Sequence, residues 1–88
     1  MRIANRNAKE QVKSLTPFEG SNLNATLSSR FYVVYSYGYY PIYIYDLMNK
    51  VWFECTDKYS PTTAKHITQS RPTEDTIKFN QFQMKSIL

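Results

Sequence analysis

The residue types that most often perform chemistry are scarce in this chain. His66 is the only histidine and Cys55 the only cysteine, and no local motif joins them into a nucleophilic pair. A zinc site needs three or four Cys, His or carboxylate ligands, and Glu54 and Asp57 do not complete such a shell. The two glycines are too few for a Gly-rich phosphate loop. We therefore expect no enzyme, no metal and no cofactor, with His66 as a structural residue.

Tyrosine is the residue type that the chain concentrates. Seven of its eight tyrosines lie between positions 32 and 45. One face of a small sheet cannot bury all of these rings, so some must lie at the surface. Tyrosine joins apolar area to a polar tip at low entropic cost, which favours binding surfaces, but such rings can equally form the half-exposed edges of a core. The candidate partner-binding residues in this region are Tyr37, Tyr39, Tyr40, Tyr43 and Tyr45.

A second candidate site lies in residues 58–71. The Ser60-Pro61 pair is typical of the first residues of a helix, whose free backbone amides attract anions. Lysines on either side of this helix start add positive charge, so a phosphate group could bind there. In the simpler interpretation, Ser60 only caps the helix and the lysines are solvated. The candidate contacts in this segment are Lys58, Tyr59, Lys65, His66 and Arg71.

The hydrophobic patterning predicts an α+β fold in a single domain, residues 1–88. Its core would be a three- to four-stranded antiparallel β-meander with two or three short helices packed on it. Asn7 would cap the first helix and Pro17 would end it. Residues 18–22 are expected to form a turn. The expected segments are a short N-terminal helix at 7–16, the β-meander at 22–56, a helix at 60–70 and a C-terminal segment at 73–88.

Three local patterns refine this outline. Residues 31–37 are nearly all aromatic or β-branched, with both faces apolar, which predicts a central strand. The hairpin at 46–50 would hold Asn49 at a positive φ. The C-terminal segment is ambiguous and fits a short strand at 76–79 followed by a helix at 81–88. That helix would bury Phe82, Met84 or Ile87 and Leu88.

The net charge of +4 is spread over two separate segments and does not form a basic arm. This is a weak electrostatic signal for a nucleic-acid partner. A single unpaired cysteine is typical of a reducing compartment, and the sequence has neither an apolar signal segment nor a stretch long enough to span a bilayer. We therefore expect a protein of the cytoplasm that does not bind membranes.

Residues 32–72 carry a pattern of particular residue types. Its first part is Tyr-Val-Val-Tyr-Ser-Tyr-Gly at 32–38, with Pro41, Tyr45-Asp46 and Trp52. Its second part comprises Lys58-Tyr59-Ser60, Thr62-Thr63, Lys65-His66, Gln69 and Arg71-Pro72. The pattern resembles a family of short, uncharacterised proteins of bacteriophages and mobile elements, except that Tyr39-Tyr40 stands where that family has a His-Phe-type pair. The resemblance implies a phage-type accessory protein in a host bacterial cytoplasm, and it implies no activity.

Two functions remain open at this point. The first is a small non-enzymatic accessory protein that binds and inhibits a host protein, for example in a defence system or a nucleic-acid-binding complex; an anti-CRISPR-like inhibitor is one form of it. The alternative is direct binding of single- or double-stranded nucleic acid, with tyrosine rings stacked on bases. An exposed tyrosine patch without nearby lysines would favour the protein partner, and tyrosines ringed by Lys and Arg would favour nucleic acid.

Overall fold

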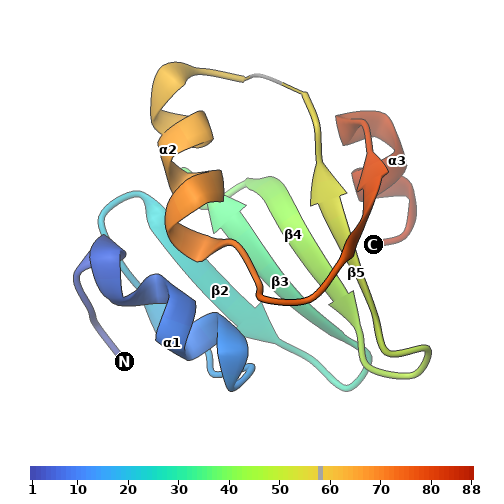
Figure 1. Ribbon diagram of the computed structural model, residues 1–88, viewed down its shortest axis with the longest axis horizontal. Coiled ribbons are helices and arrows are strands. Elements are labelled where there is room, and N and C mark those ends of the chain that lie inside the picture. The colour runs from blue at the N-terminus through green and yellow to red at the C-terminus, as the bar shows by residue number, and fades with distance from the viewer. Residues whose placement is uncertain (58) are drawn as a thin grey trace.

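The structure, a computed structural model, describes residues 1–57 and 59–88. It is an α+β fold built on one open, mixed, six-stranded sheet with the order β1-β2-β3-β4-β5-β6 (Figure 1). The strands are β1 (Phe18–Glu19), β2 (Leu23–Leu27), β3 (Phe31–Ser36), β4 (Tyr40–Asp46), β5 (Val51–Cys55) and β6 (Thr76–Phe79). The helices are the 3₁₀ turn η1 (Asn5–Asn7), α1 (Ala8–Lys13), α2 (Pro61–Ser70) and α3 (Gln81–Ser86). The predicted α+β class is confirmed, but three or four strands was too low a number.

Strand β3 lies in the interior of the sheet, as its residue types predicted. It pairs antiparallel with β2 on one side and with β4 on the other. Tyr32 and Val34 are completely buried and Val33 nearly so. The Tyr32 hydroxyl donates a hydrogen bond to the Thr16 carbonyl at 2.9 Å, so this buried polar group has a partner. The burial raises the pKa of Tyr32 well above its ordinary value.

The last strand makes the sheet mixed, which corrects the expectation of a purely antiparallel meander. Strand β6 pairs in parallel with β5, with Trp52 opposite Thr76 and Cys55 opposite Phe79. Between these two strands the chain passes through α2, and a crossover of this kind returns it to the end of the sheet where β5 began. The next strand must then run in the direction of β5. The sequence predicted the helix but not that the strand after it lies beside β5, so the parallel pairing was not expected.

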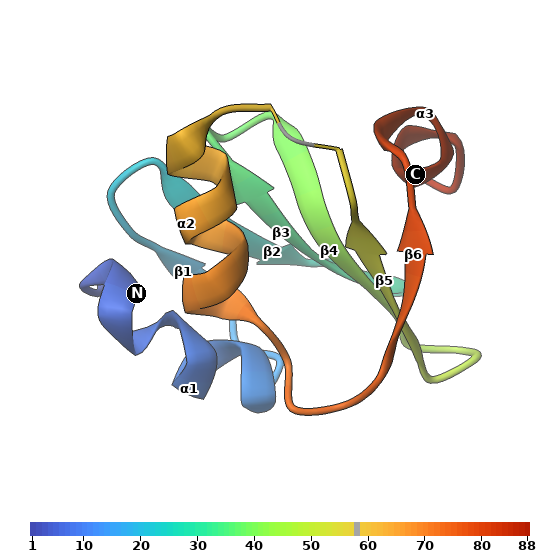
Figure 2. The same cartoon turned by 45° about the horizontal axis from the view of Figure 1, so that its top comes forward.

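The helices cover both faces of the sheet. Glu54 and Cys55 are neighbours on β5, so their side chains point to opposite faces. Glu54 is bonded to Arg71, which directly follows α2, whereas Cys55 contacts Gln81 of α3. Figures 1 and 2 show α1 and α2 side by side, with α3 at the β6 end of the sheet. Among the described residues, no helix lies across β5 and β6 on the α2 face (Figure 2).

The N-terminal elements differ from the expected helix at 7–16. Helix α1 is shorter, and the preceding turn is η1, because Asn7 makes no side-chain cap and the chain leaves the helix before Leu15, which has a φ of 55°. The expected turn at 18–22 begins instead with strand β1. Backbone hydrogen bonds from Ile3 and to Met1 hold Glu19 of this strand, so the N-terminal segment pairs along its outer side.

The hairpin between β4 and β5 and the C-terminal helix show two further differences. Lys50, not Asn49, takes the positive φ of 57°. Asn49 instead bonds to both oxygens of Asp46, which fixes it in the loop. In α3 the buried residue is Met84, whereas Phe82 is 81% exposed.

Over the described part of the chain, no helix is both long and apolar enough to cross a membrane.

Candidate functional site

A tight turn between β3 and β4 starts the candidate site. Its two central residues, Tyr37 and Gly38, have φ angles of 59° and 79°, as in a type I′ turn. The Tyr39 N–H closes the turn by donating to the Ser36 carbonyl at 3.4 Å. Gly38 suits this backbone, but a residue with a Cβ is disfavoured there, and Asn or Gly is usual at the first position. Tyr37 is therefore held in an unfavourable conformation at the tip of the hairpin.

Four tyrosines gather around this turn, and we call Tyr37, Tyr39, Tyr40 and Tyr59 the tyrosine cluster. Tyr59, from the loop before α2, stacks on Tyr40 with ring centroids 4.4 Å apart. Its ring also meets those of Tyr37 and Tyr39 edge-on at 6.0 and 6.2 Å. The hydroxyls of Tyr39 and Tyr59 are hydrogen bonded to each other. Tyr40 is buried beneath, while Tyr39 and Tyr59 are 57% and 47% exposed, so two braced rings face solvent.

The hydroxyls of the cluster differ in their environments. The hydrogen bond between the Tyr37 and Ser60 hydroxyls, at 3.4 Å, and then one with Thr62 lower the pKa of Tyr37. The hydrogen bond with Tyr59 raises the pKa of Tyr39. Burial, followed by the neighbouring Cys55, raises the pKa of Tyr40 to about 12. Tyr39 and Tyr40 therefore remain neutral at physiological pH and act as hydrogen-bonding, apolar groups.

A chain of hydroxyl groups runs beneath the cluster to His66. Ser60 donates to the Thr63 hydroxyl at 3.2 Å, the Thr63 and Ser36 hydroxyls lie 2.9 Å apart, and Ser36 Oγ lies 2.7 Å from His66 Nδ1. Since the chain starts with a donor at Ser60, it ends with Nδ1 as an acceptor of the Ser36 hydroxyl. Burial and then the nearby Lys65 lower the pKa of His66, which favours this neutral ring.

The contact between Ser36 and His66 has the residue types of a nucleophile and its base, but its position indicates a structural link. Ser36 is completely buried and is bonded on both sides, so its oxygen cannot reach an external substrate. The pair instead connects α2 to β3. The edge of the Tyr37 ring lies against the His66 ring at 6.0 Å, so the same histidine supports the tyrosine cluster from below.

Cys55 and His66 do not form the pair that was considered from the sequence. The Cys55 thiol is buried and lies 3.3 Å from Gln81 Nε2 and 4.0 Å from the Tyr40 hydroxyl. Within residues 1–57 and 59–88, no three His, Cys, Asp or Glu side chains come together as metal ligands would.

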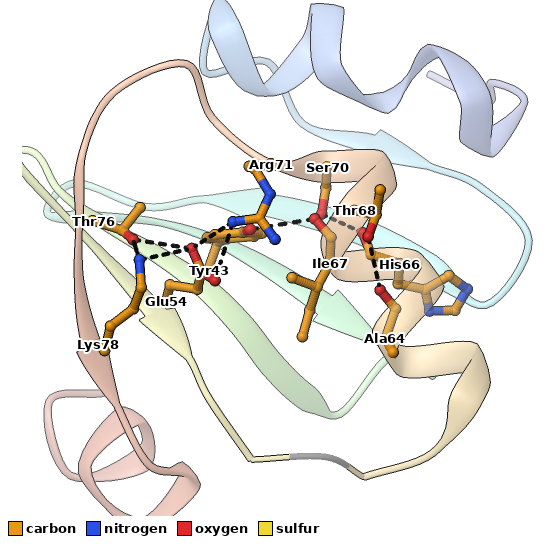
Figure 3. A network of polar contacts seen from close by, with 10 residues as sticks. All are labelled: Tyr43, Glu54, Ala64, His66, Ile67, Thr68, Ser70, Arg71, Thr76 and Lys78. Atoms are coloured by element: carbon orange, nitrogen blue, oxygen red, sulfur yellow. Dashed lines mark hydrogen bonds and ion pairs between the residues drawn. The ribbon is translucent and has the colours of Figure 1, made fainter.

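A second polar cluster lies at the C-terminal end of α2. It consists of Glu54, Arg71, Thr76 and Lys78, and we call it the Glu54 network (Figure 3). The Glu54 side chain is buried, and both of its oxygens lie 3.3 Å from Arg71 Nη1. Glu54 also accepts from the Thr76 hydroxyl at 2.9 Å and from Lys78 Nζ at 3.4 Å. This network ties the end of α2 and strand β6 to β5.

The local sequence explains how Arg71 reaches Glu54. Pro72 disfavours the helical conformation for the residue before it, and Arg71 has an extended backbone with φ of −55° and ψ of 123°. The helix therefore ends at Ser70, and the arginine side chain turns toward the sheet (Figure 3). Nearby, the buried Tyr43 hydroxyl donates to the Ile67 carbonyl at 3.2 Å, which holds the last turn of α2 against β4.

Next to this network is a groove of about 380 Å³, which we call the α2–β5 groove. The end of β5 and the following residues form one wall, and exposed positions of α2 form the other. The lining residues are Glu54, Cys55, Thr56, Asp57, Ala64, Ile67, Thr68 and Arg71.

The structure brings together only part of the predicted site. From the two sequence segments it joins Tyr37, Tyr39, Tyr40, Tyr59 and His66 at one end of the sheet. Lys65 is exposed on α2, Arg71 belongs to the Glu54 network, and Lys58 lies outside the described residues.

Tyr43 and Tyr45 lie away from the cluster, and the burial of Tyr43 removes it from the candidate surface. Tyr43 is completely buried because it lies on β4 under α2, and burial raises its pKa strongly. Tyr45 packs on Trp52 with ring centroids 4.9 Å apart. Neither ring is presented beside the exposed pair, since their strand positions point them toward the core face that α2 covers.

The Glu54 network was not predicted as a site. One sequence signal could have indicated it: Glu54 shares a strand face with Trp52, so a core-facing carboxylate needed cationic partners.

Comparison with protein-family models, curated proteins and solved structures finds no match to this chain.

Proposed function

We propose that this chain is a small non-enzymatic protein that binds a protein partner through the tyrosine cluster. The observation that carries the proposal is the pair of exposed rings, Tyr39 and Tyr59, held by contacts with Tyr37 and Tyr40. Tyrosine is among the residues that contribute most binding energy at protein interfaces, where it supplies apolar area and one hydrogen-bonding group.

The bracing of these rings supports binding in energetic terms. A flexible side chain that is ordered on association costs about 0.5–1.5 kcal/mol. Tyr39 and Tyr59 are already fixed by their mutual hydrogen bond and by ring contacts, so little ordering remains for the complex to impose. The unfavourable backbone of Tyr37 supports the same conclusion, because such conformations often occur at functional positions.

The surroundings of the cluster favour a protein over a nucleic acid. A surface that stacks bases normally surrounds its aromatic rings with Lys and Arg for the phosphates. Among the described residues, which leave out Lys58, the side-chain polar and ring contacts of the cluster are made with other tyrosines and with Ser60, Thr62, His66, Cys55 and Gln81, none of them a Lys or Arg. The described cation–π pair, Arg30 on Phe31, is elsewhere, next to the β4–β5 hairpin.

The resemblance of residues 32–72 to phage and mobile-element proteins supports a bacterial host protein as the partner. In this proposal the chain is a phage-type accessory protein of the host cytoplasm that inhibits the protein it binds. An anti-defence inhibitor of the anti-CRISPR kind is one form of this activity. Inhibition would follow from occupying a surface, so it requires no catalytic group in this chain.

The test is affinity capture from a bacterial lysate with the wild-type chain, with Tyr39→Ser/Tyr59→Ser and with Met48→Ser as the matched control. Met48 is 72% exposed on the β4–β5 hairpin at the other end of β4. We expect a nuclease-resistant protein partner whose affinity falls at least about 30-fold in the double variant and is unchanged in the control. Capture that nuclease abolishes would support nucleic acid, and equal capture by all three proteins would reject the cluster.

A further inference from the structure

We propose that the outer edge of β6 is an interaction surface and that its partner is a second copy of this chain. Strand β6 of one copy pairs antiparallel with β6 of the other across a two-fold axis, so that the two sheets become one continuous sheet. This inference does not rest on the tyrosine cluster, which is built around the β3–β4 turn.

The first argument is the direction of the backbone groups of β6. The Thr56 N–H donates to the Phe79 carbonyl at 2.8 Å, so the backbone groups of Phe79 point to β5. Because this direction alternates along a strand, those of Ile77 also point to β5, whereas those of Thr76 and Lys78 point away from the sheet. In the described part of the chain, no strand or loop bonds to these outward N–H and C=O groups. The edge therefore offers a row of donors and acceptors to another strand.

The second argument is that the two edges of the sheet differ. The N-terminal segment covers the outer side of β1, where Ile3 donates to the Glu19 carbonyl and Glu19 donates to the Met1 carbonyl. Among the described residues β6 has no such cover, and it lies at the margin of the sheet (Figure 2). Proline and outward lysines commonly keep an exposed edge from pairing. Strand β6 contains no proline, and its lysine, Lys78, is bonded to the buried Glu54 of its own sheet.

The third argument is that β6 is complementary to itself in one antiparallel register. When Ile77 lies opposite Ile77 of the second copy, Thr76 of each copy lies opposite Lys78 of the other. Both of these pairs consist of residues whose backbone groups point outward, so each pair exchanges two N–H···O bonds. The two Ile77 side chains then meet in the non-hydrogen-bonded pair, where side chains lie closest. Ile77 is 47% exposed, so the pairing removes apolar area from water.

The charges beside β6 favour a second copy over a strand of unrelated sequence. Two exposed acidic residues, Glu74 and Asp75, directly precede the strand. In the antiparallel register, Lys78 of the second copy lies opposite Thr76, next to this acidic pair. Lys78 Nζ has three donors and is bonded to Glu54 and Thr76, and its side chain is 56% exposed, so one donor remains for a carboxylate. Opposite charges therefore meet at both ends of the paired strands.

The experiment combines sedimentation equilibrium with NMR on a mixture of isotope-labelled and unlabelled chain. We expect a weak dimer with a Kd of about 100 µM, because pairing of one short edge buries less than the about 1,600 Å² of a standard interface. Isotope-filtered spectra should show an NOE between the α-protons of Ile77 in the two copies, since this pair brings the Cα atoms to about 4.5 Å. Exchange of the Thr76 and Lys78 amides with solvent should slow as the concentration rises.

A matched pair of variants at Lys78 separates the edge from its side chain. Lys78→Pro removes an outward N–H and leaves the bonds to β5, since proline is tolerated in edge strands at such positions. It should raise the Kd at least about tenfold, because both copies lose a bond. Lys78→Ala loses the same side chain but keeps the N–H, and its Kd should stay within about threefold of the wild type.

A third variant does not depend on how the fold accepts proline. Ile77→Lys changes a half-exposed side chain and places like charges directly opposite each other in the dimer. It should melt as a folded monomer and show no dimer over the concentrations used for the wild type.

The proposal is wrong if the wild-type chain stays monomeric across a range that spans this Kd. It is also wrong if folded Ile77→Lys dimerises like the wild type, or if the NOEs between copies join segments other than β6. Slower exchange of the β6 amides only after a bacterial lysate is added would show that the edge pairs with another protein, which rejects a second copy as the partner.

Discussion

At the scale of single residues, the most informative position is Tyr37 at the tip of the β3–β4 turn. Its positive φ predicts an unusual order of stability between two truncations. At an ordinary strand or helix position Ala is more stable than Gly, but at a left-handed position Gly avoids the clash of the Cβ. We expect Tyr37→Gly to melt about 4–8 °C above Tyr37→Ala, as a difference of about 1 kcal/mol gives in a domain of this size. Melting at the same temperature, or a more stable alanine variant, would show that the turn is unstrained.

The second prediction at this scale concerns the pH dependence that His66 imposes. Its pKa is lowered in the fold from the ordinary value of 6.5, so below that value the unfolded chain binds a proton more readily than the folded one. The free energy of unfolding should therefore fall as the pH drops through 6.5 toward the lowered pKa, and stay level above 6.5. Asp46 also has a lowered pKa, because hydrogen bonds from Asn49 and Met48 outweigh its burial. Asp46 lowers the free energy of unfolding only as the pH falls below its ordinary pKa of 3.8, outside the range of His66.

Denaturant unfolding at several pH values between 5 and 8 measures this effect. In His66→Gln the dependence between pH 5 and 7 should disappear, although that variant is less stable at every pH. An NMR titration of the His66 ring at or above 6.5 in the folded protein would contradict the account. The outcome matters for the surface, because a protonated ring could no longer accept the Ser36 hydroxyl beneath the tyrosine cluster.

At the scale of elements, helix α2 carries most of the site. Ser60 accepts the Thr63 N–H at 3.1 Å as its N-cap, with Pro61 at the first helical position. We expect Ser60→Ala to lower the free energy of unfolding by about 1 kcal/mol, measured by denaturant melts. Asn80→Ala removes the capping box of α3 on the opposite face of the sheet, and we expect it to lower the free energy of unfolding by a similar amount. If Ser60→Ala leaves the free energy of unfolding unchanged, α2 is held by its packing on the sheet and not by its cap.

The elements also show which features the sequence could predict. The Ser60-Pro61 and Arg71-Pro72 pairs mark both ends of α2 because proline acts locally, through its fixed φ and its clash with the preceding residue. The aromatic and branched residues of β3 predict a buried strand for a similarly local reason. The shortening of the first helix could not be predicted in this way, since no local residue type indicates that Asn7 makes no cap or that Leu15 takes a left-handed backbone.

At the scale of the whole molecule, the site depends on pairings between distant segments. Residue types indicate the two segments that hold the candidate tyrosines, but they do not indicate that Tyr59 stacks on Tyr40 or that Tyr43 lies under α2. The Glu54 network has the same origin, because β6 had to join β5 in parallel before Lys78 could reach Glu54. Such contacts are fixed by topology, which a local pattern of residue types does not contain.

The most direct test of the central claim is site-specific photocrosslinking in a nuclease-treated bacterial lysate. A benzophenone amino acid would replace Tyr39 in the tyrosine cluster in one protein and Met48 on the β4–β5 hairpin in the other, since both positions are exposed. We expect one discrete protein adduct from position 39, lost when unlabelled wild-type chain is added in excess, and none from position 48. No adduct from position 39, the same adduct from both positions, or an adduct that forms only with nucleic acid present would contradict it.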